Sequence, residues 1–564
     1  MDRIWLKSYP PEVPAEIDPS KLRSLKELQE RSYAAYANSV AYIQMGRTLS
    51  YRELDERSRA FAAWLQKVAG LKKGDRLAIM LPNVLQYPIA LFGAFRAGVV
   101  VVNTNPLYTA PELEHQLADS GATAIVVLEN FAHVVQQVLP RTQVKHVLVT
   151  GVGDLLGFPK SAVVNFVIRN VRKQIRAWHI DCASSFGAAI DAGRQQTLAP
   201  VDVGPEDIAF LQYTGGTTGV AKGAVLTHGN VTANVLQAEA WIGNVFSGKP
   251  GVLITPIPLY HVFALTANCL LFLRLGWTNV LIVNPRDFRA TVAELKKHPF
   301  DFITGVNTLF NALLHTPGFE SVDFSRLKIA LGGGMAVQAT VAQRWKQVTG
   351  HILTQAWGLT ETSPAACINP TTEDFNGSIG LPISSTDVAI KDDAGQDLAG
   401  GEIGEICVRG PQVMRGYWNR PDETEKVMLP GGWLRTGDIG RMDPKGYVFI
   451  EDRKKDMILV SGFNVYPNEV EAVAVTHPGV LEAAAVAQPD EHSGEVVALF
   501  VVRKDPSLTE HELIEHCRKS LAAYKVPRHV YFRKDLPKSN VGKILRKALR
   551  EELTQVASER KVHP

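Results

Sequence analysis

The sequence predicts an α/β protein with a large N-terminal domain of βα-layered sheets, a β-rich subdomain and a small α+β C-terminal domain. Strand-like and helix-like runs alternate through the first 440 residues, which is typical of parallel sheets with helices on both faces. After about residue 380, short strands with turn residues dominate, as in GEICVRGP and GYVFIEDR. From about residue 459 a compact unit with its own pattern follows, so a separate domain is expected there.

The alternation can be followed element by element. Residues 51–69 have the apolar spacing of a helix, with Leu54, Phe61 and Leu65 among the apolar positions. Further helices are expected at 87–96 and 111–120, and strands at 75–81, 99–103, 122–128, 301–306 and 328–333. Because helices join successive strands, the sheets are expected to be parallel.

One apolar stretch tests whether the chain crosses a membrane. Residues 250–273 contain no Asp, Glu, Lys or Arg, and their number would allow a membrane span. Two prolines, His261 and Asn268 interrupt the stretch, however, and the strand-like VLIT precedes the prolines. A buried strand, a turn and a buried helix are therefore expected, with membrane insertion as the alternative.

The C-terminal unit is expected to contain a glycine-rich turn, helix 467–475, strands 481–487 and 496–503, helix 509–521 and a basic tail. From Arg518 to Arg550 there are eleven Lys and Arg against one acid, Asp535. This local charge could attract ATP, pyrophosphate, the phosphates of coenzyme A or anionic lipid.

Composition narrows the function classes. With 60 Lys and Arg against 57 Asp and Glu, the chain has no global basic excess, so no nucleic-acid partner is expected. The five cysteines lie far apart and form no CxxC pair, which favours a reducing compartment and argues against thiolate metal ligands. The first residues lack the apolar core of a signal peptide, and a cytoplasmic protein is therefore expected.

The strongest chemical signal is YTGGTTGVAKG, residues 213–223, which follows the strand-like IAFLQ. Its glycines, threonines and one lysine supply backbone N–H groups, hydroxyls and a cation, which are the groups that bind a chain of phosphates. It is not a Walker loop, because Lys222 is followed by Gly223 rather than by Ser or Thr. A flexible surface turn is the alternative.

The loop resembles the phosphate loop of the adenylate-forming superfamily, which includes acyl-CoA synthetases, luciferases and peptide-synthetase adenylation domains. Seven further motifs follow in the order of that family: PLYHVFAL, LGGGM, WGLTE, GEICVRGPQVMRGYW, WLRTGD, DRKKDMILVSGFNVYPNEVE and PKSNVGKILR. Residues 433–457 are most similar to bacterial long-chain-fatty-acid–CoA ligases.

The resemblance implies a reaction in two steps. A fatty-acid carboxylate attacks the α-phosphate of ATP, which gives an acyl-adenylate and pyrophosphate, and the thiol of coenzyme A then displaces AMP. ATP and coenzyme A are implied as substrates, with Mg²⁺ as cofactor. No covalent enzyme nucleophile is needed, so the protein would position the reactants and stabilise charge.

The resemblance also assigns nucleotide-binding residues. Glu361 and Thr214 would hold Mg²⁺, and Lys543 would enter from the tail to stabilise the adenylation transition state. Trp357 stands where the family usually has Tyr, so a hydrogen bond made by the phenol oxygen is in doubt. The implied ATP- and AMP-binding residues are Tyr213, Thr214, Gly215, Gly216, Thr217, Thr218, Gly219 and Lys222 in the loop, Gly333, Gly334 and Trp357 at adenine, Gly358 in the same motif as Trp357, Thr360 at the α-phosphate, Asp438 at ribose, and Arg453 at ribose and phosphate.

Domain movement is a further implication. The family turns a mobile C-terminal domain about the position of Lys455, which divides this chain into 1–452, a hinge at 453–458 and 459–564. Ser461, Gly462 and Phe463 would then face the pantetheine arm of coenzyme A, although a plain strand–turn–helix connector would use the same residues.

The acyl site is less sharply defined. His261 would lie where the acyl and phosphate sites meet, but a hydrogen-bonded core histidine is an equal alternative. An apolar tunnel is expected near residues 303–314, with Gly305 as the residue that lets the acyl chain pass. Hydrophobic periodicity cannot distinguish residues that line a tunnel from residues of the core.

Residues 158–178 suggest a membrane partner. Val164, Val167, Val171, Ile175 and Trp178 fall at helical spacing, and the segment carries five positive charges and no acid. An anionic membrane surface and a helix packed on the domain with a basic outer face explain this equally well. Peripheral location on the cytoplasmic face is expected, and a homodimer is left open.

Two other functions are weighed against a fatty-acid–CoA ligase. A luciferase-like or peptide-synthetase-type adenylating enzyme would share the nucleotide motifs. A non-catalytic lipid and nucleotide sensor could retain a relic site, but the joint presence of Glu361, Asp438 and Lys543 argues against it.

Overall fold

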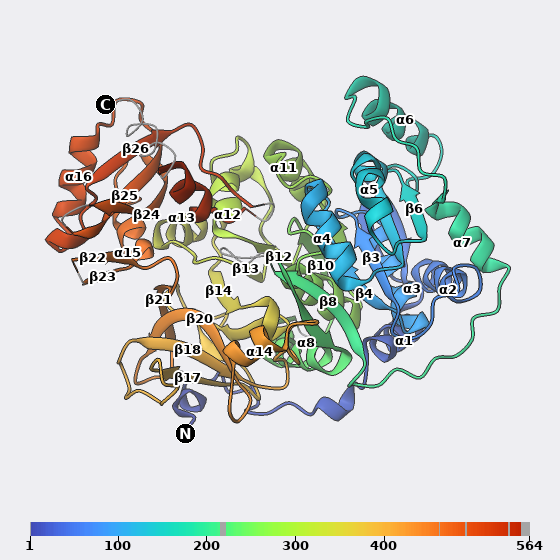
Figure 1. The fold of residues 1–564 in the computed structure, drawn as a ribbon, viewed down its shortest axis with the longest axis horizontal. Helices are drawn as coiled ribbons and strands as arrows, with labels where there is room; N and C mark the ends of the chain where they lie inside the picture. Colours follow the sequence, from blue (N-terminus) through green and yellow to red (C-terminus); the bar gives the residue numbers. More distant parts are fainter. Residues whose placement is uncertain are drawn as a thin grey trace.

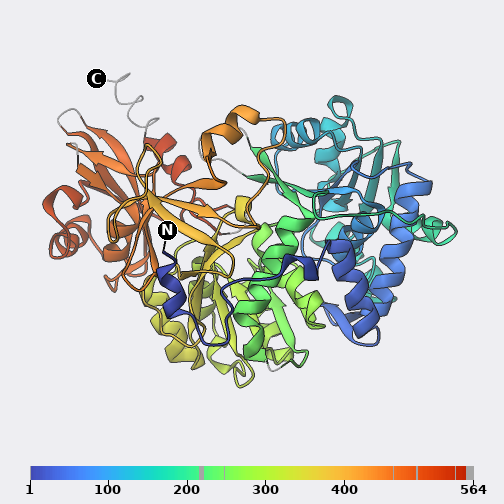
Figure 2. The same cartoon turned by 90° about the horizontal axis from the view of Figure 1, so that it is seen from below.

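The computed structural model describes residues 2–214, 221–246, 248–461, 463–490, 493–539 and 542–553. It has the predicted arrangement: parallel sheets layered with helices, a β-rich subdomain and a C-terminal α+β domain (Figure 1). In Figure 2 the first residues lie along the β-rich subdomain, where Arg3 pairs with Asp387.

The first sheet is parallel except for its last pair, β8 and β9, which form an antiparallel hairpin. Its strand order is β7 (Ala183–Ser185), β6 (His146–Thr150), β5 (Ala124–Leu128), β3 (Arg76–Met80), β4 (Val100–Asn103), β8 (Ile208–Thr214) and β9 (Lys222–Thr227). Its central strands are buried along their length, as expected for a sheet covered on both faces.

The second sheet is parallel from β1 to β14 and adds antiparallel strands at its edges. Its order is β16 (Leu381–Pro382), β15 (Ala365–Ile368), β14 (Leu353–Gly358), β13 (Ile329–Gly332), β12 (Phe302–Gly305), β10 (Val252–Thr255), β11 (Thr278–Leu281), β1 (Val40–Gln44) and β2 (Arg47–Ser50).

Alternate residues of the strands face different cores. Leu77 and Phe302 belong to the largest apolar cluster, which contains residues from both sheets and from the helices α1 (Leu25–Tyr36), α2 (Tyr51–Lys67), α3 (Gln86–Ala97), α7 (Phe186–Arg194), α8 (His228–Ile242) and α10 (Leu271–Arg274). Ala78 of the first sheet faces α4 (Ala110–Ser120) and α5 (Ala132–Val138). Ile303 of the second sheet faces α11 (Phe288–Lys297), α12 (Asn307–Leu314) and α13 (Ala339–Thr349). Both sheets are therefore covered on two faces, as predicted.

The predicted strand, turn and helix at 250–273 are confirmed. β10 is followed by a turn, by α9 (Val262–Ala264), by the π-helical turn Leu265–Leu270 and by α10. The segment is mostly buried inside the domain. In the part of the chain that the structure describes, no helix is long and apolar enough to cross a membrane.

The β-rich subdomain contains β17 (Asp387–Lys391), β18 (Gly404–Arg409), β20 (Trp433–Met442), β19 (Met428–Leu429) and β21 (Val448–Arg453), with α14 (Pro421–Val427) beside it. β20 and β21 are antiparallel, and their register places Asp438 opposite Arg453. Two predicted ribose residues, fifteen positions apart in sequence, therefore lie side by side on neighbouring strands.

The C-terminal domain has the strand order β23 (Phe463–Val465), β22 (Ile458–Val460), β25 (Gly494–Arg503) and β24 (Val480–Asp490), and β26 (His529–Arg533) also pairs with β25. Its helices include α15 (Pro467–Ala474) and α16 (Glu510–Arg518), so α16 ends earlier than predicted. The basic tail contains β26 and a helical stretch at 546–553. Acids elsewhere in the domain neutralise much of its charge: Lys525 pairs with Glu469, and Lys538 with Glu482.

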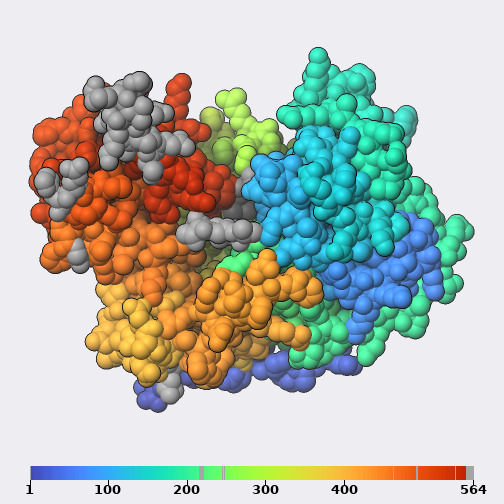
Figure 3. Space-filling model, in the orientation of Figure 1, coloured from blue at the N-terminus to red at the C-terminus, as the bar shows by residue number. Residues whose placement is uncertain are grey.

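The basic segment at 158–178 forms α6 (Lys160–Phe166) and the π-helical turn Val167–Val171. The helix is shorter than predicted, because residues beyond 172 have no regular structure up to β7. Val164 and Ile168 pack against the domain, whereas the other face is solvent-exposed. Its large exposed apolar residues are Phe158, Val163, Phe166 and Val171. Figure 3 shows this segment projecting from the surface.

Candidate active site

The predicted nucleotide residues converge on a cavity of about 1160 Å³ between the second sheet, the β8–β9 hairpin, the β-rich subdomain and the C-terminal domain. It lies at the carboxyl ends of β10, β12, β13 and β14, which is where open parallel sheets bind ligands. The predicted residues that line it are Tyr213, Thr214, Lys222, His261, Gly333, Gly334, Trp357, Gly358, Thr360, Glu361, Asp438, Arg453, Lys455 and Lys543.

The predicted phosphate end of the cavity is formed by the β8–β9 hairpin. Thr214 ends β8 and Lys222 begins β9, and the two are register partners at the mouth of the hairpin loop. Tyr213 donates its hydroxyl hydrogen bond to Asp119 Oδ2 (2.6 Å), which fixes the strand end. The predicted loop residues Gly215, Gly216, Thr217, Thr218 and Gly219 lie outside the described residues.

Two residues not predicted from the sequence hold this end together. Tyr417 donates a hydrogen bond to Glu361 Oε1 (2.7 Å), and its ring lies 4.7 Å from Lys222 Nζ. The same ammonium group lies 2.6 Å from Glu423 Oε2 on α14. The hydrogen bond from Lys222 lowers the pKa of Glu423 to about 2. Tyr417 lies in the motif GEICVRGPQVMRGYW, and Glu423 follows shortly after it. The sequence analysis used this motif only to support the family resemblance.

The glycines after β13 form a surface without side chains. Gly333 donates its N–H to Gly305 O (3.1 Å), and Gly334 adopts φ +78°. This left-handed backbone favours glycine, and the Lys543 side chain passes beside it: a Cβ at Gly334 would lie 3.6 Å from Lys543 Cε, at van der Waals contact. At Gly358 a Cβ would lie 1.8 Å from Pro364 O, which explains that glycine by packing.

Asp438 is fully enclosed and binds two described partners. Trp357 Nε1 donates to Asp438 Oδ2 (2.9 Å), and Arg453 Nε lies 2.5 Å from Oδ1. Burial raises the pKa of Asp438, while Arg453, the indole N–H and Lys543 oppose that effect. Trp357, at which a phenol hydrogen bond was in doubt, therefore supplies an indole N–H that binds the carboxylate of Asp438, the predicted ribose residue.

Lys543 enters the cavity from the C-terminal domain. Its side chain lies beside Gly334, and the preceding residue is tied to α12, because Thr308 Oγ1 donates to Gly542 O (3.0 Å). Burial, together with Arg453, lowers the pKa of Lys543 to about 8, while Asp438 and Glu361 oppose the shift. A protonated Lys543 would supply positive charge between the ribose and phosphate ends.

His261 lies at the junction of the cavity and α9. Its Nδ1 accepts the N–H of Phe263 (3.3 Å) and caps the helix. Burial lowers the pKa of His261 to about 3, and Lys543 adds to the shift. The ring is therefore neutral near pH 7, and its proton resides on Nε2. The histidine is hydrogen-bonded within the domain, and it also lines the cavity.

The apolar part of the cavity lies elsewhere than expected. Gly305 is not among the residues that line it, and a Cβ at this glycine would lie 2.7 Å from the Phe310 ring. Its carbonyl instead supports Gly333. Lining residues from 303–314 are the polar Asn307, Thr308 and Asn311, whereas Ala238, Ile242, Ala267 and Leu271, on α8 and on the segment 265–274, supply an apolar wall. Sequence periodicity missed this wall because these residues look like ordinary core.

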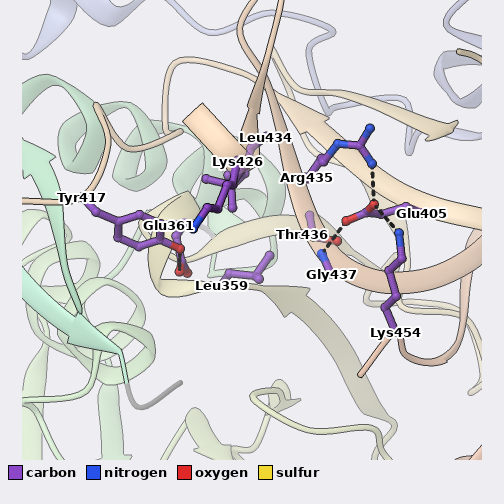
Figure 4. Close-up of a pocket in the computed structure, with 11 residues that line it drawn as sticks. Leu359, Glu361, Glu405, Tyr417, Lys426, Leu434, Arg435, Thr436, Gly437 and Lys454 are labelled. Carbon is purple, nitrogen blue, oxygen red and sulfur yellow. Dashed lines mark hydrogen bonds and ion pairs between the residues drawn. The ribbon is translucent and has the colours of Figure 1, made fainter. Parts of the chain in front are cut away.

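The chain around Lys455 is held on both sides. Figure 4 shows Lys454, whose Nζ lies 2.6 Å from Asp393 Oδ1 and 3.5 Å from Glu405 Oε2. Glu405 also accepts hydrogen bonds from Arg435 and from the N–H of Gly437. Lys454 is therefore fixed to the β-rich subdomain.

On the other side of Lys455, the chain is held by the C-terminal tail. Arg550 Nη1 donates to Asp456 Oδ1 (2.8 Å). Burial lowers the pKa of Lys455, which lies between these two anchors.

Of the predicted coenzyme A residues, the two that the structure describes, Ser461 and Phe463, do not reach the cavity. Ser461 and Phe463 belong to the β22–β23 hairpin, and neither lines it. The Phe463 side chain is exposed and stacks on Tyr524 with ring centroids 5.0 Å apart. Gly462 lies outside the described residues.

Comparison with known proteins identifies the family. The family model described as AMP-binding enzyme matches residues 29–418, and that described as AMP-binding enzyme C-terminal domain matches residues 469–543. The chain belongs to the AMP-binding enzyme family. A relative from Escherichia coli O157:H7, named long-chain-fatty-acid–CoA ligase, is 54% identical over 98% of both chains. One of the same name from Bacillus subtilis is 40% identical, again over 98% of both.

Solved structures share the fold over nearly the whole chain. The anthranilate CoA ligase AuaEII in complex with anthranoyl-AMP superposes with a TM-score of 0.85 at 25% identity, covering 96% of this chain and 100% of that one. ATP-bound MatB from Rhodopseudomonas palustris superposes with a TM-score of 0.82 at 27% identity, covering 94% and 99%.

Proposed function

We propose that this AMP-binding enzyme is a long-chain-fatty-acid–CoA ligase, which converts a fatty acid, ATP and coenzyme A into acyl-CoA, AMP and pyrophosphate. The observation that carries the proposal is the convergence of Thr214, Glu361, Asp438 and Lys543 on one cavity that continues into an apolar wall. The relatives named long-chain-fatty-acid–CoA ligase support the acyl class.

The proposed first step joins the carboxylate to the α-phosphate. The ribose hydroxyls bind Asp438, the adenine lies between the Gly333–Gly334 backbone and Trp357, and the β- and γ-phosphates face Thr214 and Lys222. The carboxylate oxygen then attacks the α-phosphorus and pyrophosphate leaves. Lys543 and Thr360 stabilise the negative charge that develops on the α-phosphate oxygens. Neutral His261 donates from Nε2 at the acyl end.

Magnesium fits the donors at the phosphate end. Glu361 Oε1 is bound by Tyr417, and Thr214 offers a hydroxyl nearby on the same cavity wall. Among the described residues, no group of three or more His, Cys, Asp and Glu side chains could hold a metal alone. This suits a cation that binds one carboxylate together with substrate phosphates. When bound, Mg²⁺ would neutralise charge on the β- and γ-phosphates.

We propose that the second step requires rotation about Lys455, with 1–452 as the stationary domain, 453–458 as the hinge and 459–564 as the mobile domain. Lys454 is fixed to the stationary side and Asp456 to the mobile side, so the rotation would concentrate at the residue between them. Rotation would remove Lys543 and bring Ser461, Gly462 and Phe463 toward the cavity. The coenzyme A sulfur would then attack the acyl carbonyl carbon, with AMP as the leaving group.

Pyrophosphate release tests this function. Incubation with ATP, Mg²⁺ and palmitate is expected to release pyrophosphate, and added coenzyme A is expected to convert bound acyl-adenylate into palmitoyl-CoA. A series of C6 to C18 acids would rank the chain lengths. Pyrophosphate release that does not depend on a fatty acid would contradict the proposal.

We propose a peripheral contact with anionic membrane on the cytoplasmic side through residues 158–178. Phe158, Val163, Phe166 and Val171 form its exposed apolar face, and Arg172, Lys173 and Arg176 are exposed beside it. Apolar side chains next to a basic cluster suit an anionic lipid surface. The homodimer remains a prediction.

Vesicle co-sedimentation tests the membrane contact. The chain is expected to sediment with phosphatidylcholine vesicles only when phosphatidylglycerol is included, and Phe158→Ser with Phe166→Ser should abolish this. Val68→Ser, which changes an exposed apolar residue elsewhere, is the matched control. Equal binding by all variants would contradict this surface.

A further inference from the structure

Asp452 is a buried carboxylate at the junction of the two domains that the proposed chemistry does not use. It lies on β21, which pairs with β20 of the β-rich subdomain, and its side chain is fully buried. Its Oδ2 accepts the N–H of Asn468 (2.8 Å), and its Oδ1 lies 3.7 Å from Arg546 Nη1. Both of these partners belong to the C-terminal domain.

The bond to Asn468 is a helix cap supplied by another domain. α15 begins at Pro467, and the side chain of its own N-cap residue, Tyr466, makes no capping hydrogen bond. The first N–H groups of a helix have no partner within the helix, and a carboxylate there is favoured by both hydrogen bonding and the helix dipole. Asp452 therefore caps the N-terminus of α15, a role that an Asp or Ser next to the helix usually fills.

A chain of contacts connects this cap to the adenylation lysine. Arg546 donates to both Glu471 oxygens (2.9 Å each) and to Asn468 Oδ1 (2.7 Å), which ties the tail to α15. Lys543 lies three residues before Arg546. Asp452 thus holds α15, α15 holds Arg546, and Arg546 fixes the base of the loop that places Lys543 in the cavity.

Rotation about Lys455 would break the contacts of Asp452 with the mobile domain but leave those among Arg546, Glu471 and Asn468 intact. Asp452 would keep the N–H of Arg453 but lose its two partners in the mobile domain, which is costly for a buried carboxylate, and a helix that loses its cap is destabilised. The Asp452 contacts therefore stabilise this orientation of the domains relative to the rotated one.

We propose that Asp452 is a positioning residue for adenylation, which holds the C-terminal domain, and with it Lys543, in the adenylating orientation by capping α15 and binding Arg546 across the hinge. This inference rests on the proposed two-step function with domain rotation.

Half-reaction rates test the proposal in the full chain. Single-turnover pyrophosphate release with ATP and palmitate measures adenylation, and palmitoyl-CoA formation from preformed palmitoyl-adenylate measures the second step. Asp452→Ala is expected to slow adenylation about tenfold and to leave the second step within about twofold of the parent. Asp452→Asn keeps an acceptor for Asn468 but loses the charge. Its adenylation rate should lie between those of the parent and Asp452→Ala.

Asp387→Asn is the matched control. It removes a buried, arginine-paired carboxylate from the same β-rich subdomain, but its partners Arg3 and Arg409 both lie on the stationary side. The ratio of its two rates should equal that of the parent. Equal losses in both half-reactions for Asp452→Ala, or no loss, would overturn the proposal. A parent protein that fails to form palmitoyl-adenylate would instead overturn the proposed function.

A distance measurement keeps the test independent of rate. Spin labels at Ser321→Cys and Ser520→Cys, in a Cys182→Ser background, report on the domain orientation; the remaining cysteines are buried. With a non-hydrolysable ATP analogue, the parent should give one distance and Asp452→Ala a second population. An unchanged distribution in a folded Asp452→Ala protein would overturn the positioning role.

Discussion

The two ends of the nucleotide cavity are built differently. At the phosphate end, Lys222, Glu361, Tyr417 and Glu423 all belong to the N-terminal part of the chain and contact one another directly. At the ribose end, Asp438 and Arg453 meet Lys543, which arrives from the C-terminal domain. One end is therefore complete within a single body, while the other is assembled only when two domains meet.

This difference means that the two ends affect different steps: one affects the binding of ATP, and the other affects the half-reaction that needs Lys543. Groups within one domain can bind triphosphate in any domain orientation, whereas a lysine on a second domain acts only in one of them. Substitutions at the phosphate end should therefore change ATP and metal affinity, and Lys543 substitutions should change one half-reaction.

The largest effect is expected for Lys543→Ala. Loss of the cation that stabilises the developing charge should slow adenylation by about 100-fold or more and leave thioester formation from preformed acyl-adenylate unchanged. The two rates are measured separately by single-turnover assays. Equal decreases in the adenylation and thioester-forming rates would contradict the proposed difference between the two ends of the cavity.

Asp438→Asn should lower kcat/KM for ATP by about 10- to 100-fold, because Arg453 loses its buried partner and the ribose hydroxyls lose a charged acceptor. Steady-state kinetics with varied ATP checks this prediction. Asp443→Asn changes a turn carboxylate in the same subdomain and serves as control. An unchanged KM and kcat for Asp438→Asn would show that ribose binds elsewhere.

A pH profile tests the lysine in another way. The ammonium form of Lys543 exists below its pKa of about 8. The kcat/KM for adenylation should therefore be constant below pH 7 and decrease about tenfold per unit above the pKa. Lys543→Arg, whose guanidinium stays charged, should remove this decrease even if the rate is lower. A profile that is the same for both side chains would assign the titration to another group.

Tyr417→Phe removes only the hydroxyl that binds Glu361 Oε1. A lost hydrogen bond of this kind costs about 1 kcal/mol, so the half-saturating Mg²⁺ concentration should rise about three- to tenfold. Pyrophosphate release at varied Mg²⁺ measures the change. Tyr447→Phe, at a similar bond to Glu373 outside the cavity, should have no such effect. Equal Mg²⁺ dependence in parent and Tyr417→Phe would contradict the role of Tyr417.

The smallest effect is expected for Glu423→Gln, which should strengthen rather than weaken ATP binding. Glu423 competes with phosphate for Lys222, so Glu423→Gln should lower the Kd for ATP about twofold. Isothermal titration with a non-hydrolysable ATP analogue measures it. Weaker binding would mean that Glu423 helps to position Lys222 rather than compete for it.

The sequence predicted the local groups of the site better than their partners. Thr214, Glu361, Asp438 and Lys543 stand in short motifs whose residue types suit phosphate and ribose, and all four line one cavity. Tyr417 lies 56 residues from Glu361, and Glu423 lies 201 residues from Lys222. No local pattern encodes such pairs, because they depend on how separate strands and helices pack.

The acyl wall and the segment 158–178 show a second limit. Gly305 was expected to let the acyl chain pass, but it does not line the cavity, and a Cβ there would meet the Phe310 ring. Apolar residues that line a cavity and those that fill a core have the same periodicity. The basic segment has one apolar face packed on the domain and another exposed to solvent. Composition alone could not show which of its apolar residues belong to which face.

The central claim is that distant segments bind one nucleotide jointly, and a crystal structure with palmitate and α,β-methylene-ATP tests it most directly. The account predicts ribose on Asp438, adenine between Trp357 and Gly333–Gly334, and the α-phosphate within hydrogen-bonding distance of Lys543. A nucleotide bound outside this cavity, or bound there with Lys543 turned away, would contradict it.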